Sequence, residues 1–203
     1  MRRTPGPRYL LGGEPLKPRW ATLAVVLATA GAACASTAES PDPPAPVPAG
    51  ALPGNPQEVV VIDAAALASD AEDAPGLLDL LEDAGFVIGT ERRFSQAMPG
   101  RRTMRARVLH FDDPAGARRY LEWLEEHADE VIGEAEAGEP LERPDAALYV
   151  HEPNACCAGD SRVALVAWSD GAVVVTLEVG GPATQVSDLP GLAARLDEAV
   201  GSA

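Results

Sequence analysis

A proline-rich tract, residues 36–56, is the feature that most constrains how this chain can fold. Its prolines are Pro41, Pro43, Pro44, Pro46, Pro48, Pro53 and Pro56. Proline has no backbone N–H to donate and favours extended polyproline conformations, so the tract does not suit a helix or a central strand. We predict a semi-rigid spacer of about 3 Å per residue. The spacer separates a short N-terminal segment from residues 57–203, which are numerous enough for one domain with its own core.

The segment before the spacer has the pattern of an export signal. Residues 1–19 hold five basic residues and one acid, and residues 20–33 form an uncharged run that ends in small residues. A basic start followed by a short apolar run is typical of a secretory leader. The run is shorter than the roughly 20 apolar residues of a membrane-spanning helix. We therefore predict that residues 1–33 direct the chain out of the cytoplasm.

One cysteine lies at the end of this leader. Gly31-Ala32-Ala33-Cys34 resembles the lipobox of bacterial lipoproteins, with Gly31 where leucine is common. The resemblance implies that the Cys34 thiol is lipidated, that residues 1–33 are removed and that residues 34–56 form the tether. The lipid bilayer is then a partner of the chain, on the extracytoplasmic face of the cell membrane, and two or more acyl chains hold it stably. The alternative is an ordinary cleaved secretory signal with an incidental cysteine.

The charge of the remaining chain limits its partners. The leader holds five of the 16 basic residues and one of the 31 acids, so residues 34–203 carry a formal net charge of −19. A domain this acidic repels nucleic acid and anionic bilayers. We therefore expect no nucleic-acid partner.

The hydrophobic pattern of residues 57–203 predicts a mixed fold. Apolar residues at helical spacing indicate helices at 63–68, 73–85, 114–131 and 188–200. Apolar and alternating runs indicate strands at 58–62, 86–94, 103–111, 146–150, 162–169 and 172–179, with a hairpin turn at Asp170-Gly171. The β-branched run at 58–62 should be a buried strand. This order predicts an α+β domain, a mainly antiparallel sheet with helices packed on one face. "LLEDAGF" and "VLHFDDPAGARRYLEWL" resemble small α+β domains of actinobacterial lipoproteins.

Motifs for catalysis and for cofactors are not found in the sequence. It contains no P-loop, no Gly-x-Gly-x-x-Gly, no His-Glu-x-x-His and no Gly-x-Ser-x-Gly around Ser161. We predict no catalytic residue and no cofactor, which favours a binding protein over an enzyme.

The segment from His151 to Asp160 contains adjacent cysteines, Cys156 and Cys157. In an oxidising compartment they can form a vicinal disulfide that stiffens the loop, which is the reading we favour. They can also be two free thiols. A third reading is a soft-metal site for Cu(I), with His151 as an additional ligand. The ligand count is too low for structural zinc.

Basic residues gather in an otherwise acidic domain. They are Arg92, Arg93, Arg101, Arg102, Arg105 and Arg107. One interpretation is ion pairing with neighbouring acids, which contributes little per pair at a surface. The other is a docking face for an anionic partner, such as an envelope polymer or an acidic protein. Within residues 103–111, Arg105 and Arg107 share one side of a strand, and Met104, Ala106 and Val108 share the side that should face the helices.

Two functions are consistent with these observations. The first is a membrane-anchored binding or interaction module of the cell envelope. The second is an envelope enzyme whose site is assembled from scattered residues, and copper binding through Cys156 and Cys157 is a further alternative. A deep pocket lined by titratable groups would favour the enzyme, and a shallow exposed face would favour the binding module.

Overall fold

The computed structural model describes residues 45–96, 102–133, 135–138, 146–151, 162–182 and 184–202. The chain divides into two units, residues 1–39 and 40–203, and every described residue belongs to the second unit. Four of the candidate site residues lie outside the described ranges: Cys34, Arg101, Cys156 and Cys157.

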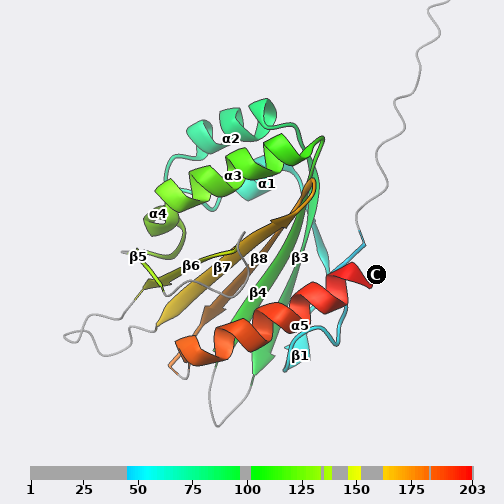
Figure 1. Cartoon of the computed structure of the whole chain (residues 1–203), viewed down its shortest axis with the longest axis vertical. Helices are drawn as coiled ribbons and strands as arrows, with labels where there is room; N and C mark the ends of the chain where they lie inside the picture. Colours follow the sequence, from blue (N-terminus) through cyan, green and yellow to red (C-terminus); the bar gives the residue numbers. More distant parts are fainter. Residues whose placement is uncertain are drawn as a thin grey trace, which may run out of the picture. The chain divides into compact units, whose positions relative to one another are not determined.

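One antiparallel sheet organises the second unit (Figure 1). Within the described residues it has eight strands in the order β1-β3-β4-β8-β7-β6-β5, with β2 also paired to β3. The strands are β1 (Asn55–Pro56), β2 (Val60–Ile62), β3 (Phe86–Gln96), β4 (Arg102–Phe111), β5 (Ala135–Ala137), β6 (Ala146–His151), β7 (Val163–Asp170) and β8 (Val173–Gly180). The predicted α+β class with a mainly antiparallel sheet is confirmed.

Helices cover both faces of this sheet. They are α1 (Ala64–Ala68), α2 (Ala74–Asp83), α3 (Pro114–Glu126), α4 (Ala128–Ile132) and α5 (Leu189–Gly201), preceded by the 3-10 turn η1 (Val186–Asp188). Helices α1–α4 lie over one end of the sheet, and α5 crosses the other end (Figure 1). None of these helices in the described part of the chain combines the length and apolar character of a membrane span.

The alternation of side chains along β8 shows that α5 and α1–α3 lie on opposite faces. Val175 packs in the cluster that contains Leu192 of α5, whereas its neighbour Val174 packs with Tyr120 of α3. Successive residues of a strand point to opposite faces. The expectation of helices on one face is therefore corrected. The run of three valines, residues 173–175, is apolar on both faces and needs cover on each.

The folded part of the chain begins before Gln57. Val47, Ala51 and Leu52 are buried in the core on the α5 side, where they join Phe94 and Met104. The backbone N–H of Ala51 donates to the carbonyl oxygen of Pro48 at 3.1 Å. The end of the proline-rich tract thus closes one side of the sheet, since its few apolar residues reach the core between prolines.

Aspartates begin three of the helices, as their sequences indicate. Asp63 accepts a hydrogen bond from Ala66 N at 2.7 Å, and Asp113 accepts one from Gly116 N at 2.8 Å. Asp73 accepts one from Gly76 N at 3.1 Å. These side chains satisfy backbone N–H groups that have no partner inside the helix.

Three local expectations differ from the structure. The helix predicted for 114–131 breaks at His127, whose φ of −125° and ψ of 25° separate α3 from α4. The hairpin loop is Gly171-Ala172, one residue later than predicted, because Asp170 still pairs with Val173. Strand β2 is not buried: of its three residues only Ile62 is covered.

Candidate binding groove on the sheet

The arginines of β3 and β4 divide between the two faces of the sheet. Arg93 pairs with Arg105, and Arg107 pairs with Glu91, on the face that carries α1–α4. Arg92 and Arg102 lie on the α5 face, where Arg102 forms an ion pair of 2.9 Å with Asp188. Met104, Ala106 and Val108 are buried in the α5 core, as the alternation predicts.

An ion-pair network, which we call the arginine cluster, joins β3, β4, β8 and the end of α1. Among the described residues it comprises Arg93, Arg105, Arg107, Asp70, Glu91 and Glu178. Glu91 lies at its centre. Arg93 Nε donates to Glu91 Oε1 at 2.6 Å, and Arg107 Nε donates to Glu91 Oε2 at 2.8 Å.

Asp70 connects this cluster to the helical layer. It lies just beyond α1 and accepts hydrogen bonds from Arg107 and, at 3.0 Å, from Arg105 Nη1. Arg105 Nη1 also lies 3.6 Å from Glu178 Oε2 on β8. Three positive charges thus face three negative charges, so the cluster is close to electrically neutral within a strongly acidic domain.

Burial makes the centre of the cluster energetically important. Arg107 is 8% exposed and Glu91 is 6% exposed. Burial by itself raises the pKa of Glu91, but hydrogen bonds and positive charges from Arg107, Arg93 and Arg105 outweigh it, so the pKa lies below its usual value. Burial lowers the pKa of Arg107, but its bonds to Asp70 and Glu91 outweigh this and raise the pKa. Both groups are therefore charged at neutral pH.

Tyr120 of α3 is buried close enough to Arg107 and Asp70 of the cluster to interact with their charges. Its burial raises the pKa to about 12, although the positive charge of Arg107 acts in the opposite direction. The phenol is therefore neutral at physiological pH.

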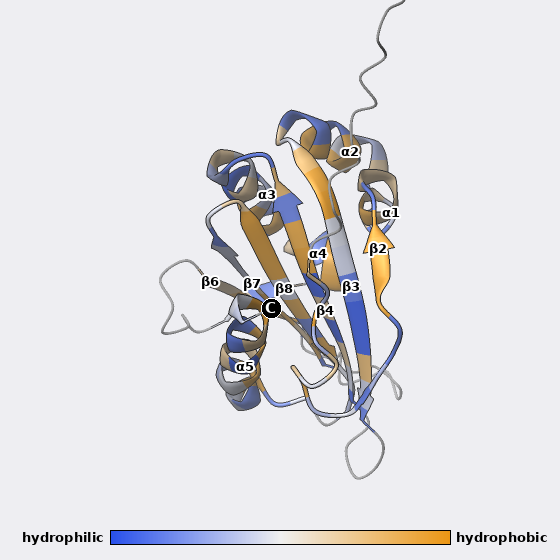
Figure 2. Cartoon of the chain, turned by 90° about the vertical axis from the view of Figure 1, so that its right-hand side faces the viewer, coloured by the Kyte–Doolittle hydropathy of each residue, from blue (hydrophilic) through white to orange (hydrophobic). Residues whose placement is uncertain are grey.

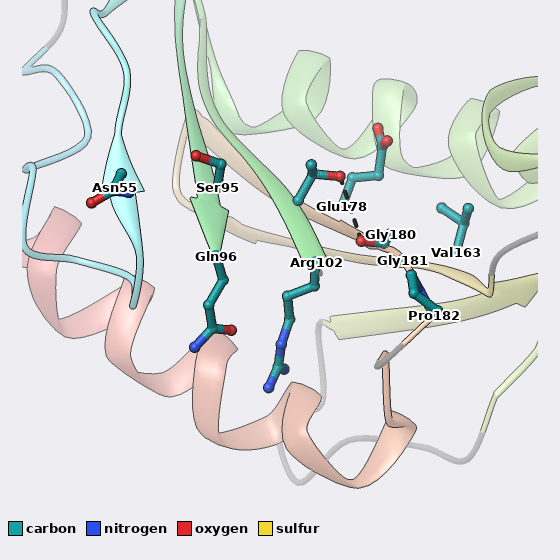
Figure 3. A pocket seen from close by; sticks show the side chains of 10 residues that line it. Asn55, Ser95, Gln96, Arg102, Val163, Glu178, Gly180, Gly181 and Pro182 are labelled. Atoms are coloured by element: carbon teal, nitrogen blue, oxygen red, sulfur yellow. Dashed lines mark hydrogen bonds between the residues drawn. The ribbon is translucent and has the colours of Figure 1, made fainter. Parts of the chain in front are cut away.

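An open pocket of about 610 Å³ lies beside the arginine cluster, at the end of the sheet away from α1–α4 (Figure 3). Its lining residues are Asn55, Ser95, Gln96, Arg102, Thr103, Val163, Glu178, Gly180, Gly181 and Pro182. Figure 3 shows Gln96 and Arg102 pointing toward α5, while Ser95 and Val163 point to the other face. Strands β1, β3, β4, β7 and β8 each contribute lining residues to this pocket.

Two further hollows continue the pocket across the sheet. One, of about 240 Å³, shares Ser95, Thr103 and Glu178 with the pocket and is also lined by Arg93 and Arg105. The next, of about 310 Å³, shares Gln57 and Arg93 with it and is also lined by Glu91 and Val60. Because neighbouring hollows share lining residues, we call this row of three hollows, from Pro182 to Val60, the sheet groove.

Gly180 lines the groove between Thr103 of β4 and Val163 of β7. A Cβ at this position would lie 3.7 Å from Thr103 Oγ1 and 3.8 Å from Val163 Cγ2. Any longer side chain here would fill the space between these neighbours. Its own carbonyl oxygen accepts a hydrogen bond from Thr103 Oγ1 at 3.4 Å. The floor is therefore backbone and small side chains.

His151, the candidate third ligand of the soft-metal site, ends β6 and pairs with Val163, which lines the groove. Cys156 and Cys157 lie outside the described residues. The Nδ1 atom of His151 is buried and has no hydrogen-bond partner within the described part of the chain. The described residues contain no group of three or more His, Cys, Asp or Glu arranged to hold a metal ion.

Sequence reasoning identified the arginines but missed Asp70, Glu91 and the groove. One signal was present: Glu91 and Arg107 lie on consecutive strands, and their alternation with Arg93 and Arg105 suits opposite-charge pairing across a hairpin. Asp70 carries no such signal, because it lies 37 residues from Arg107 in the chain.

No protein-family model matches this chain. No curated protein matches it either. Among solved structures, it is similar to the crystal structure of the extracellular domain of PknH from Mycobacterium tuberculosis, with 13% sequence identity and a TM-score of 0.46. The match covers 74% of this chain and 84% of that chain.

Proposed function

We propose that the chain is a membrane-anchored binding module of the bacterial cell envelope. Its ligand lies along the sheet groove, and an acidic group of that ligand contacts Arg93. The observation that carries this proposal is the open groove over a glycine floor, with an arginine cluster along its side.

The location rests on the N-terminal sequence. A basic start, a short apolar run, small residues before Cys34 and a proline-rich tract after it together favour export and lipid attachment. Cys34→Ala should release the protein from membranes or leave its leader uncut. Fractionation and migration like those of the wild type would contradict the anchor.

Arg93 is the arginine of the cluster best placed to meet a ligand. Its side chain is 54% exposed, compared with 26% for Arg105 and 10% for Arg107. Its Nε is held by Glu91, which orients the guanidinium at the groove. Guanidinium groups bind carboxylate and phosphate in two-pronged geometry, so an acidic ligand group is the best match.

The electrostatics of the groove favour binding over acid–base catalysis. A general acid needs a pKa near the working pH. The arginines lower the pKa of Glu91 instead and keep its carboxylate ionised. The groove is also open to solvent, which suits the binding of an extended molecule.

The test uses the detergent-solubilised protein and a panel of soluble envelope glycans that carry carboxylate groups, phosphate groups or neither. Gly180→Leu fills the groove and should reduce binding at least tenfold. Its matched control is Gly191→Leu, at an exposed position of α5 with open space around it. Arg93→Gln should weaken binding of the acidic glycans alone. Unchanged glycan binding by Gly180→Leu would contradict the proposal that the ligand lies in the sheet groove. Equal loss of acidic and neutral glycan binding in Arg93→Gln would contradict the proposal that Arg93 contacts an acidic group.

A further inference from the structure

Strand β2 exposes apolar side chains at the edge of the sheet. Among the described residues, Val60 and Val61 are the large hydrophobic side chains that are exposed, at 57% and 54%. They are neighbours in sequence and lie on one strand. Figure 2 shows β2 as a hydrophobic strand at the outer side of β3.

The outer edge of β2 has backbone groups available for pairing. Within the described residues, β2 pairs with β3 on one side, and no strand pairs with its other side. An edge strand presents unpaired N–H and C=O groups to any extended chain. Pro56 removes a donor from β1, but residues 57–63 contain no proline. Among the residues that the structure describes, the edge is therefore open at β2.

The two valines would both contact an added strand. Val60 lies beside Glu91 and Val61 beside Thr90, so they point to opposite faces of the sheet. Ile62 is buried and holds the strand against the helical layer. An added strand would thus cover Val60 on one face and Val61 on the other with its own side chains.

Charges at the two ends of β2 select the kind of strand that fits. Glu58 and Asp63 are exposed and flank the apolar stretch 59–62. If a second copy paired antiparallel with Val60 opposite Val61, each Glu58 would lie opposite an Asp63. Like charges directly opposite each other destabilise a strand pair. A strand with basic residues at both ends would instead pair favourably with them.

We propose that the open edge of β2 binds an extended segment of another protein, with β-branched residues at its centre and Lys or Arg at both ends. The segment adds a strand to the sheet by main-chain hydrogen bonds. Its basic ends meet Glu58 and Asp63, which gives the interaction its specificity. The excess negative charge of the chain also favours the approach of a basic partner. Glu58 and Val60 also line the last hollow of the sheet groove, but an added strand pairs along the outer edge of β2, whereas Gly180 lies at the other end of the groove, so Gly180→Leu separates the two proposals.

The test uses a fluorescein-labelled peptide, Lys-Val-Thr-Val-Thr-Lys, and the detergent-solubilised protein. Fluorescence anisotropy should show binding that weakens as salt is raised, because the flanking charges contribute. A peptide with Glu in place of both Lys residues should bind at least tenfold more weakly. A peptide N-methylated at alternate residues, on the edge that would face β2, should not bind, because it cannot donate the main-chain hydrogen bonds.

Variants of the protein separate this surface from a general charge effect. Glu58→Lys should weaken binding at least threefold and reduce its salt dependence, whereas Glu122→Lys on the exposed side of α3 should not change it. The double variant Val60→Ser and Val61→Ser should weaken binding about tenfold while its circular dichroism stays that of the wild type. Gly180→Leu should bind the peptide as tightly as the wild type. The peptide assay can therefore fail or succeed separately from the glycan assay of the sheet groove.

Three results would overturn the proposal. The first is equal binding of the N-methylated peptide, and the second is equal effects of Glu58→Lys and Glu122→Lys. The third is a dimer of the solubilised protein that Val61→Ser dissociates, which would assign the edge to a second copy.

Discussion

Removal of the Glu91 charge tests whether the arginine cluster holds the helical layer to the sheet. Glu91→Gln keeps the size of the side chain but takes away the negative charge that accepts bonds from Arg93 at 2.6 Å and Arg107 at 2.8 Å. Arg107 is buried, so its positive charge loses one of its two principal partners.

The structure sets the expected size of the effect. Removal of one partner from a buried ion pair costs about 3–5 kcal/mol. Asp70 still contacts Arg107, and the glutamine oxygen still accepts a hydrogen bond, so we expect a loss of about 2–3 kcal/mol. For a domain of this size that corresponds to a decrease in melting temperature of about 4–12 °C.

Urea unfolding followed by tryptophan fluorescence measures this loss. The m-value should stay unchanged while the midpoint decreases. Glu122→Gln, on the exposed side of α3, is the matched control and should stay within about 0.5 kcal/mol of the wild type. A loss below about 1 kcal/mol for Glu91→Gln would refute the reasoning, since it would mean that Asp70 alone satisfies Arg107.

Three further predictions concern pH, packing and redox state. The pKa of Glu91 lies below its usual 4.5, so the stability that Glu91 contributes is complete above pH 4.5 and is lost as the pH falls through the folded-state pKa. Urea unfolding at pH 7 and pH 3 should show that the difference in unfolding free energy between the wild type and Glu91→Gln decreases at the lower pH. Gly116→Ala should destabilise the protein by about 1–3 kcal/mol, because its methyl group would clash with the carbonyl oxygen of Ala84. The intact mass of the exported protein should increase by two hydrogens on reduction, as a Cys156–Cys157 disulfide requires.

Each of these predictions has an outcome that contradicts it. A constant difference between wild type and Glu91→Gln at both pH values would mean that the Glu91 carboxylate contributes nothing to acid sensitivity. Gly191→Ala in α5, which has open space around it, is the control for the glycine change and should be neutral or slightly stabilising. Two thiols that are alkylated without reductant would exclude the disulfide, and a stoichiometric copper adduct would favour the metal site instead.

Local features of this protein followed from the sequence because their partners are close along the chain. Asp63 and Asp113 begin their helices through bonds to residues three positions ahead. The alternation of Met104 with Arg105 was equally local, since a strand turns successive side chains to opposite faces. The α+β class followed from the same periodicities.

The faces that helices cover were decided by the tertiary structure. Residues 173–175 are apolar on both sides of β8. This pattern predicts that both faces are buried, but it does not indicate which helix covers each face. Leu192 of α5 and Tyr120 of α3 come to opposite sides of this strand because of the path of the chain between them. Periodicity contains no information about that path.

The candidate sites depend on the tertiary structure for the same reason. Asp70 reaches Arg107 across 37 residues, and Gly180 forms a groove only because Thr103 and Val163 stand on either side of it. The sequence alone determined the charges, the helix starts and the strand alternation. Strand order and helix packing decided which charges became buried partners, which glycine became a groove floor and which valines stayed exposed, because those outcomes depend on residues distant in the chain.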